Sequence, residues 1–566
     1  MNRRTFLASA SGKTRAPGDS VNAKGTRAVS TFANKVLPRV TRTTAGLEPY
    51  SGPWGPDQVA HLLRRTMFGV SKNHLDTLLQ GTLESAILTL FSPPPAPSPP
   101  LNTNASDPDV AVGQTWINAP TNSANGPRNT SLKSWWISLM LNQPLAIQEK
   151  MVLFWHNHFV SASATVSDAR LAYKQNQLLR DNALGNFKNL VKLITIDPAM
   201  LKYLNGNTNT KTNPNENYAR ELQELFTIGK GPEIGPGNYT NYTEVDVIAA
   251  AKVLTGWRVN ATTLQPYFTL SRHDVTNKQF SSAYGNTVIV GSTDPAGTTE
   301  INALVEMIFA QTETARFICR KLYRWFVYYL IDEATEDNII IPLANILRSN
   351  NYEVLPVLSA LLSSAHFFDP INIGCQIKNP IDFTVGLCRM FPIAFPNATN
   401  LVGQYNHWKF VRTQAANMQM DVCDPPNVAG WPAYYQLPEY YELWINSDTL
   451  QKRTLYGEII ATTGHSQNGF TLVADLIPFV QQFPNPGSPD ALVDALTRLL
   501  FPIPLTENQK AFLKGILIPG LPDYEWTNEW NAYLSDPSNS DRVDAITSKL
   551  KALLSFMVCM PEYQLA

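Results

Sequence analysis

KTNPNENYARELQELFTIG, at residues 211–229, carries the clearest helix signals in this chain of 566 residues. Asn213 is a residue type that caps helix N-termini, and Pro214 stands at the first helical position, where its missing N–H costs nothing. Glu216 follows the cap by three residues, as in a capping box. Gly229 suits the left-handed turn that closes many helices. The stretch therefore predicts a helix that begins after Asn213 and ends at Gly229.

One face of this predicted helix is apolar, and its flank carries carboxylates. At about 100° per residue, the apolar stripe consists of Tyr218, Leu222, Leu225 and Phe226. The flank, within roughly 60° on an ideal helix, consists of Asn217, Glu221 and Glu224. A carboxylate at the boundary of a core rarely lacks a partner. We therefore expect Glu221 to have one, which is either a structural partner or a ligand.

Helical spacing recurs along most of the chain. Residues 144–160, PLAIQEKMVLFWHNHFV, are apolar on nearly every face, which predicts a buried central helix. Residues 265–291 instead contain two β-type runs separated by polar residues and by Gly285-Asn286, which predicts a small hairpin or sheet insertion. The expected fold is a mainly α, multihelical globular protein with a small β-hairpin insertion around 265–291.

The first 49 residues differ from the rest of the chain. They hold nine Lys and Arg against two acids, which favours a basic, disordered tail. MNRRTFLASA resembles the beginning of a twin-arginine export signal, but Gly12, Lys13 and Arg15 interrupt the apolar region that such a signal needs. A chance basic N-terminus or a decayed signal is the alternative. Residues 50–566 are expected to form a single large helical domain, or two lobes at 50–370 and 371–566.

Composition excludes some classes of function. The net charge of −1 gives no general attraction for nucleic acid, and no apolar run reaches the length of a transmembrane helix, about 18 residues. The five cysteines include no C-x-x-C pair, which argues against a zinc ribbon or a thioredoxin-type motif. Gly-rich phosphate loops and a G-x-S-x-G elbow are also missing from the sequence.

Several segments stand out along the chain, in this order: HLLRRTMFG, EKMVLFWHNHF, DPAMLKYLNG, NPNENYARELQELFTIG, YTEVDVIAAAKVLTGW, the pair His273-Asp274, DPPNVAGW and the closing LLSFMVCMPEYQLA. Together they resemble a bacterial family known as domain of unknown function 1800. PPNVAGWPAYYQ is similar to the Bacteroidetes branch. The resemblance, over roughly residues 54–566, implies a mostly helical, exported protein, often encoded beside a sulfatase-like partner. A periplasmic or extracellular location is therefore expected, and a cytoplasmic one is the alternative.

Two histidines in the predicted central helix invite a metal interpretation. Residues two apart on a helix point about 200° from each other, so His156 and His158 share one ion only if the helix ends near Trp155. A divalent metal held by Glu221, Glu224 and His156 is one hypothesis, because two carboxylates at i and i+3 can reach one ion. His158 is a further candidate for acid/base work. The alternatives are hydrogen-bonded core histidines, and carboxylates that pair with an arginine.

Two further segments could carry chemistry. His273-Asp274 is either a catalytic dyad on the β insertion or ordinary turn chemistry. Asp421 and Asp424 lie in a loop that Pro425-Pro426 makes rigid, which suits a site and suits a turn equally well. In the helix predicted near residue 60, Arg64-Arg65 form either a solvated face, which we favour, or an anchor for an anion.

An aromatic cluster points to a different class of function. Six rings fall within fourteen residues: Trp431, Tyr434, Tyr435, Tyr440, Tyr441 and Trp444. They could form a stacking platform for sugars or a partner interface, or they could pack in a core. Two functions follow from the sequence. One is a metal-assisted hydrolase acting on extracellular polymer or its fragments. The other is a non-catalytic binding or assembly protein, with a polysaccharide or cell-surface partner.

Overall fold

A computed structural model describes residues 19–21, 27–29, 45–391 and 393–566. The chain separates into two compact units, Met1–Thr43 and Thr44–Ala566. In the first unit, β1 (Asp19–Val21) pairs antiparallel with β2 (Arg27–Val29). The rest of the predicted tail up to residue 44, including its twin-arginine-like start, lies outside the described residues. The division of the larger unit into two lobes stays a prediction.

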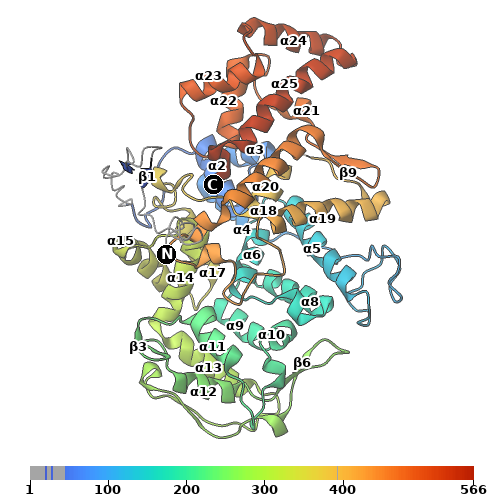
Figure 1. The fold of residues 1–566 in the computed structure, drawn as a ribbon. Coiled ribbons are helices and arrows are strands. Elements are labelled where there is room, and N and C mark those ends of the chain that lie inside the picture. The colour runs from blue at the N-terminus through green and yellow to red at the C-terminus, as the bar shows by residue number, and fades with distance from the viewer. Residues whose placement is uncertain (1–18, 22–26, 30–44, 392) are drawn as a thin grey trace. The chain divides into compact units, whose positions relative to one another are not determined.

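The second unit is built of helices, as the sequence predicts (Figure 1). Its first half contains α2 (Pro56–Thr66), α3 (Lys72–Leu79), α4 (Leu83–Phe91), α5 (Asn125–Leu141), α6 (Gln148–His158), α7 (Ser163–Val166), α8 (Ala169–Asp181), α9 (Phe187–Thr195), α10 (Pro198–Tyr203), α11 (Glu216–Glu221), α12 (Glu244–Val253), α13 (Thr298–Ala310) and α14 (Thr312–Phe326). Its second half contains α15 (Glu333–Thr335), α16 (Ile341–Ser349), α17 (Val354–Leu362), α18 (Pro380–Met390), α19 (Leu401–Asn417), α20 (Ser447–Glu458), α21 (Leu476–Gln481), α22 (Pro489–Leu500), α23 (Glu507–Leu517), α24 (Asp523–Ser535) and α25 (Ser540–Cys559). Within the described ranges, none of these helices combines the length and the apolar character needed to cross a bilayer.

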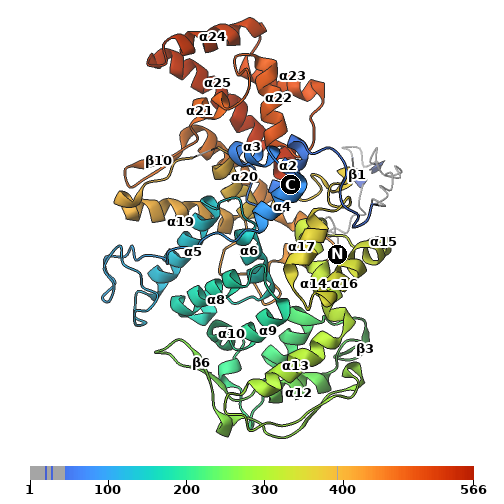
Figure 2. The same cartoon turned by 180° about the vertical axis from the view of Figure 1, so that it is seen from behind.

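Helix α6 occupies the middle of this unit. Figures 1 and 2 show α22–α25 gathered at one end, α11–α13 at the other, and α6 between them. Met151, Val152, Leu153 and Trp155 are fully buried, so the helix is enclosed on all faces as its composition predicts. It runs without interruption through His158. The prediction of a buried central helix is confirmed.

The strands form small antiparallel pairs. Within the predicted insertion, β5 (Trp257–Val259) pairs with β6 (Pro266–Phe268), and β7 (Lys278–Gln279) pairs with β8 (Val288–Ile289). Two further hairpins join β3 (Glu233–Gly235) to β4 (Asn238–Tyr239), and β9 (His465–Gln467) to β10 (Phe470–Leu472). The predicted mainly α fold with a small β insertion is confirmed, although the insertion begins earlier, at Trp257.

The helix of residues 211–229 begins later than predicted. Asn215, not Asn213, is the N-cap: its side chain accepts from the N–H of Asn217, and α11 starts at Glu216. The reason is a tight turn, in which the N–H of Asn213 donates to Thr210 O at 3.0 Å. The predicted capping box at Glu216 is therefore wrong.

A second difference is that α11 widens after one and a half turns. Residues Leu222–Thr227 continue it as a π-helix, in which the Thr227 hydroxyl donates to Leu222 O at 2.5 Å. Gly229 has a φ of 74° and ends the helix, as predicted. A π turn shifts the side chains that follow it around the helix axis, so the α-helical face assignment does not hold beyond Leu222.

Candidate functional site

The two histidines of α6 face different surroundings. His156 packs edge-on against Trp136 at a ring-centroid distance of 5.2 Å and also lies against Trp431 at 5.9 Å. Its Nε2 is buried and has no hydrogen-bond partner within the described chain, and burial lowers its pKa to about 4. His158 instead meets Phe226 O, 3.0 Å from its Nε2. The two imidazoles therefore contact different neighbours, as the continuous helix predicts.

Glu221, the last residue of α11, lies close to Glu224 in the π-helix that follows. Glu224 forms an ion pair with Lys230 at 2.6 Å and accepts from the Tyr242 hydroxyl at 2.9 Å. Glu221 is half-buried, and its side chain makes no hydrogen bond or ion pair within the described residues. Burial, together with the Glu224 charge, raises the pKa of Glu221 to about 7. The structural partner expected for Glu221 is therefore not found among the described residues, and the neighbouring Glu224 carboxylate repels it.

The predicted metal ligands do not converge. Over the residues that the structure describes, no group of three or more His, Cys, Asp or Glu side chains is placed to hold a metal ion. Glu221 and Glu224 are neighbours, but His156 does not join them in such a group. His156 is enclosed between Trp136 and Trp431 instead.

His273 and Asp274 belong to the framework of the β insertion. His273 Nε2 lies 3.0 Å from Glu300, which also forms an ion pair with Lys278 at 2.6 Å. All three side chains are almost fully buried. The Asp274 carboxylate instead accepts from the N–H and the hydroxyl of Thr276, as in a turn. The partner of His273 is thus Glu300, from α13, and not the adjacent aspartate.

The rigid loop at Asp421 and Asp424 is tied to neighbouring helices. Lys133 of α5 bridges both aspartates, and Arg412 of α19 binds Asp421. Asp424 also accepts from the Ser163 hydroxyl, at 2.9 Å. Each carboxylate therefore has a cationic partner, as expected for a loop held in place by ion pairs.

Most of the aromatic cluster gathers at one enclosed pocket. Its walls include Tyr434, Tyr440, Tyr441 and Trp444, with Trp325 of α14 stacked on Tyr434 at a centroid distance of 4.5 Å. Trp431 lies apart, fully buried against His156, and Tyr435 lines a neighbouring cavity. The cavity itself is small, with a volume of about 30 Å³. Four of the six predicted platform residues are thus brought to one pocket.

The same pocket is rich in positive charge. Five of its lining residues are cationic, from helices α2, α6 and α14 and from the segment before α18: Arg64, Arg65, Lys150, Arg324 and Lys378. One described lining side chain, Asp382, is acidic. Arg453, which donates to Lys378 O at 2.8 Å, adds a sixth buried cation nearby. The N-terminus of α18, where the helix dipole is positive, also faces this space through Asn379 and Asp382.

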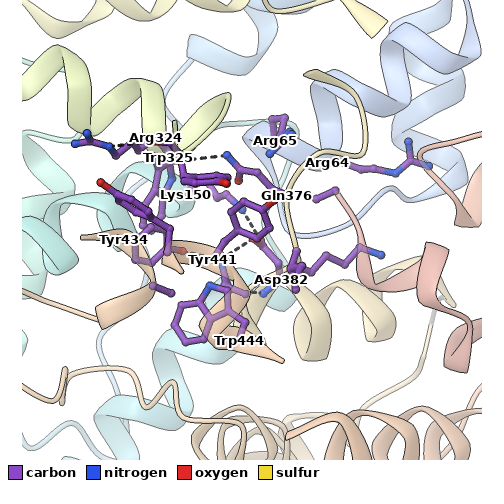
Figure 3. A pocket seen from close by; sticks show the side chains of 17 residues that line it. Arg64, Arg65, Lys150, Arg324, Trp325, Gln376, Asp382, Tyr434, Tyr441 and Trp444 are labelled. Atoms are coloured by element: carbon purple, nitrogen blue, oxygen red, sulfur yellow. Dashed lines mark hydrogen bonds and ion pairs between the residues drawn. The ribbon is translucent and has the colours of Figure 1, made fainter. Parts of the chain in front are cut away.

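Asp382 forms an ion pair with Lys150. Lys150 is the residue of the largely apolar helix α6 that lines this pocket. Lys150 Nζ donates to Asp382 and lies 4.9 Å from the centre of the Phe68 ring. Figure 3 shows this ion pair among Trp325, Tyr434, Tyr441 and Trp444, with the guanidinium groups of Arg64 and Arg324 directed to opposite sides, away from it. Burial lowers the pKa of Lys150 despite the neighbouring carboxylate.

The other cations are held by carbonyl oxygens. Arg64 donates to Leu499 O and Phe501 O at 2.9 Å, and Arg65 donates to Asn372 O at 3.0 Å. The Nε atoms of both arginines are buried without a hydrogen-bond partner in the described chain. Both side chains are almost fully buried, so the favoured prediction of a solvated face at Arg64-Arg65 is wrong. The alternative, an anchor for an anion, stays open.

Burial lowers the pKa values of these cations. It lowers the pKa of Arg64 to about 10 and that of Arg453 to about 9. It also holds the pKa of Lys378 well below its ordinary value. Carbonyl groups accept from some of the N–H donors, but they do not neutralise the charge. The pocket wall therefore carries more positive charge than its own carboxylate cancels.

Several of these residues were not predicted from the sequence, namely Lys150, Arg324, Gln376, Lys378 and Asp382. A lysine inside an otherwise apolar helix was a signal for Lys150, because buried lysines are rare unless paired. The remaining residues come from segments that only the tertiary fold brings together.

Comparison with known proteins places the chain in a family. A family model described as "Protein of unknown function (DUF1800)" matches residues 61–565. No curated protein and no solved structure matches the chain. The family model covers nearly the whole sequence, in line with the resemblance found in its motifs. The chain therefore belongs to the DUF1800 family of proteins of unknown function.

Proposed function

We propose that this protein binds a ligand through an anionic group, such as a sulfate, phosphate or carboxylate, in the pocket between α2, α6, α14 and α18. The observation that carries the proposal is the excess of positive charge: the pocket wall contains five cationic residues and one acidic side chain, Asp382. A buried charge without a counter-charge costs free energy. An anion in the pocket would recover part of that cost.

The aromatic wall indicates what the anionic group is attached to. Tyr441 is partly exposed to the pocket, and Trp444, Tyr434 and Trp325 complete an aromatic surface beside the cations. Aromatic rings offer an apolar face to the C–H bonds of a sugar ring, while arginine and lysine bind the anionic substituent. A charged saccharide end group matches the chemistry of both features, and the pocket, whose cavity is about 30 Å³, would have to widen to admit its sugar ring. This proposal extends the binding role predicted from the aromatic cluster.

Of the two functions predicted from the sequence, the geometry supports binding better. Metal-assisted hydrolysis has less support, because Glu221, Glu224 and His156 do not come together as one ligand set. An extracytoplasmic location and a sulfatase-like partner stay predictions from the family resemblance. A charged polysaccharide outside the cell would agree with both.

The experiment is calorimetric titration of the full chain with inorganic sulfate, glucose 6-sulfate and glucose. We expect both anions to bind, glucose 6-sulfate more tightly, and their affinity to fall as ionic strength rises. Tyr441→Ala should weaken the binding of glucose 6-sulfate by roughly fivefold, in line with about 1 kcal/mol for an aromatic contact. The control is Tyr267→Ala, on hairpin β6, where the side chain is 48% exposed. Glucose binding as tightly as its sulfate, or no binding of either anion, would refute the proposal.

A further inference from the structure

A lysine without a carboxylate lies in the cavity next to the anion pocket. Lys321 of α14 donates from Nζ to Leu225 O at 3.0 Å and lies 3.2 Å from His158 Nδ1. Within the described chain, no ion pair involves Lys321. The cavity wall also contains Asn157, Arg324 and Tyr435, and none of its described lining residues is acidic.

The protonation state of His158 follows from its hydrogen bonds. Its Nε2 faces Phe226 O, a group that can only accept, so Nε2 carries the hydrogen. Burial, with Lys321 nearby, holds the pKa of His158 well below its ordinary value, so the ring is neutral. Its Nδ1 therefore offers a lone pair to Lys321 and serves as an acceptor.

These contacts leave Lys321 in a reactive state. Burial and the nearby Arg324 charge lower the pKa of its ammonium group to about 7. A neutral amine has two N–H donors and one lone pair. His158 Nδ1 and Leu225 O take the two donors, so the lone pair is left unengaged. A lysine desolvated beside another cation is a recognised form of amine nucleophile.

We propose that Lys321 captures the carbonyl group of a small aldehyde or 2-oxo acid as an imine, with Arg324 receiving the ligand's carboxylate. The Nζ lone pair attacks the carbonyl carbon and forms a C–N bond. The carbonyl oxygen leaves as water, with the two protons that the amine gives up. Arg324 lines the cavity and donates from Nε to Tyr329 O at 3.1 Å. Its positive charge is also the neighbouring charge that lowers the pKa of Lys321. This chemistry goes beyond anion binding and does not depend on it, because Lys321 does not line the anion pocket.

The test is trapping of the imine in the wild-type protein. Glyoxylate is added with sodium cyanoborohydride, which delivers hydride to the imine carbon and leaves a carboxymethyl group on the lysine. Peptide mass spectrometry then compares labelling rates at Lys321 and at Lys192 of α9, which forms an ion pair with Glu306 at 2.9 Å. At pH 7 an ordinary lysine has less than about a thousandth of its amine neutral. We therefore expect Lys321 to react at least about tenfold faster, with a half-maximal rate near pH 7.

Acetaldehyde and three variants separate the parts of the proposal. With acetaldehyde, which has no carboxylate, the preference for Lys321 over Lys192 should shrink, and Arg324→Gln should abolish the difference between the two probes. Lys321→Arg should remove the fast-labelled peptide, while Lys192→Arg should leave it.

Equal labelling of Lys321 and Lys192 by glyoxylate would overturn the imine proposal. Fast labelling with no preference for glyoxylate would overturn the role of Arg324. Sulfate binding in calorimetry is expected to persist in Lys321→Arg, so failure here is distinguishable from failure of the proposed function.

Discussion

Replacing Glu221 with glutamine should stabilise the protein at alkaline pH and leave it unchanged at acidic pH. The Glu221 carboxyl is half-buried beside Glu224, and burial and that neighbouring charge raise its pKa to about 7. Its ordinary value in an unfolded chain is about 4.3. The folded protein therefore binds this proton more tightly than the unfolded chain does. Stability is lost as pH rises from about 4 to about 7, and the penalty is fully present above that range.

The size of the stability penalty follows from the difference between the folded and the unfolded pKa of Glu221. For a fully buried carboxyl group, this difference would correspond to a penalty of about 3 to 4 kcal/mol. Because part of the Glu221 side chain remains in water, we expect about 1 to 2 kcal/mol. Glutamine keeps the size of the side chain and removes the charge.

Urea denaturation of wild type and Glu221→Gln at pH 8 and at pH 4 measures the effect. The variant should gain about 1 to 2 kcal/mol at pH 8 and nothing at pH 4. Glu224→Gln is the matched control, because it breaks the ion pair with Lys230 and weakens the bond from Tyr242, and it should bring no gain. A Glu221→Gln variant that is less stable at pH 8, or equally changed at both pH values, would refute the reasoning.

Two further predictions concern the framework. Asn215→Ala should lower the free energy of unfolding by about 1 kcal/mol through loss of the helix cap, whereas Asn213→Ala should be nearly neutral; thermal melts showing the reverse order would restore the cap to Asn213. Lys278→Met should cost about 3 to 5 kcal/mol, because it leaves the buried Glu300 carboxylate without its cation, while Lys452→Met, at a surface ion pair, should cost at most about 1 kcal/mol. Equal urea midpoints for these two lysine variants would contradict the assignment of His273 and its partners to the framework.

The sequence predicts the features that depend on local pattern. Residues 144–160 are apolar on nearly every face of a helix, and this pattern predicted the buried helix α6. A continuous helix through residue 158 also predicted that His156 and His158 point in different directions. The β insertion followed from β-branched and aromatic runs. The cap was misplaced because Asn213 and Asn215 both have capping chemistry, and a turn closed by Thr210 decides between them.

The candidate site depends on contacts that local pattern does not encode. The π turn at Leu222–Thr227 changes the side-chain faces after Glu221, so a constant 100° rotation could not place Glu224. The anion pocket joins α2, α6, α14, α18 and the aromatic segment, which are far apart in the sequence. The aromatic residues could be found as a dense cluster, but the cations around Asp382 could be recognised only once the fold had brought them together.

The central claim is that the pocket holds an anion, and its most direct test is a crystal structure of the protein soaked with selenate. Selenate has the shape and charge of sulfate, and its anomalous scattering identifies it without ambiguity. We expect an anomalous peak inside the pocket, beside Tyr441 and within hydrogen-bonding distance of at least one of Lys150, Arg65 and Lys378. Selenate bound only at surface sites, with this pocket free of it, would show that the pocket is not an anion site.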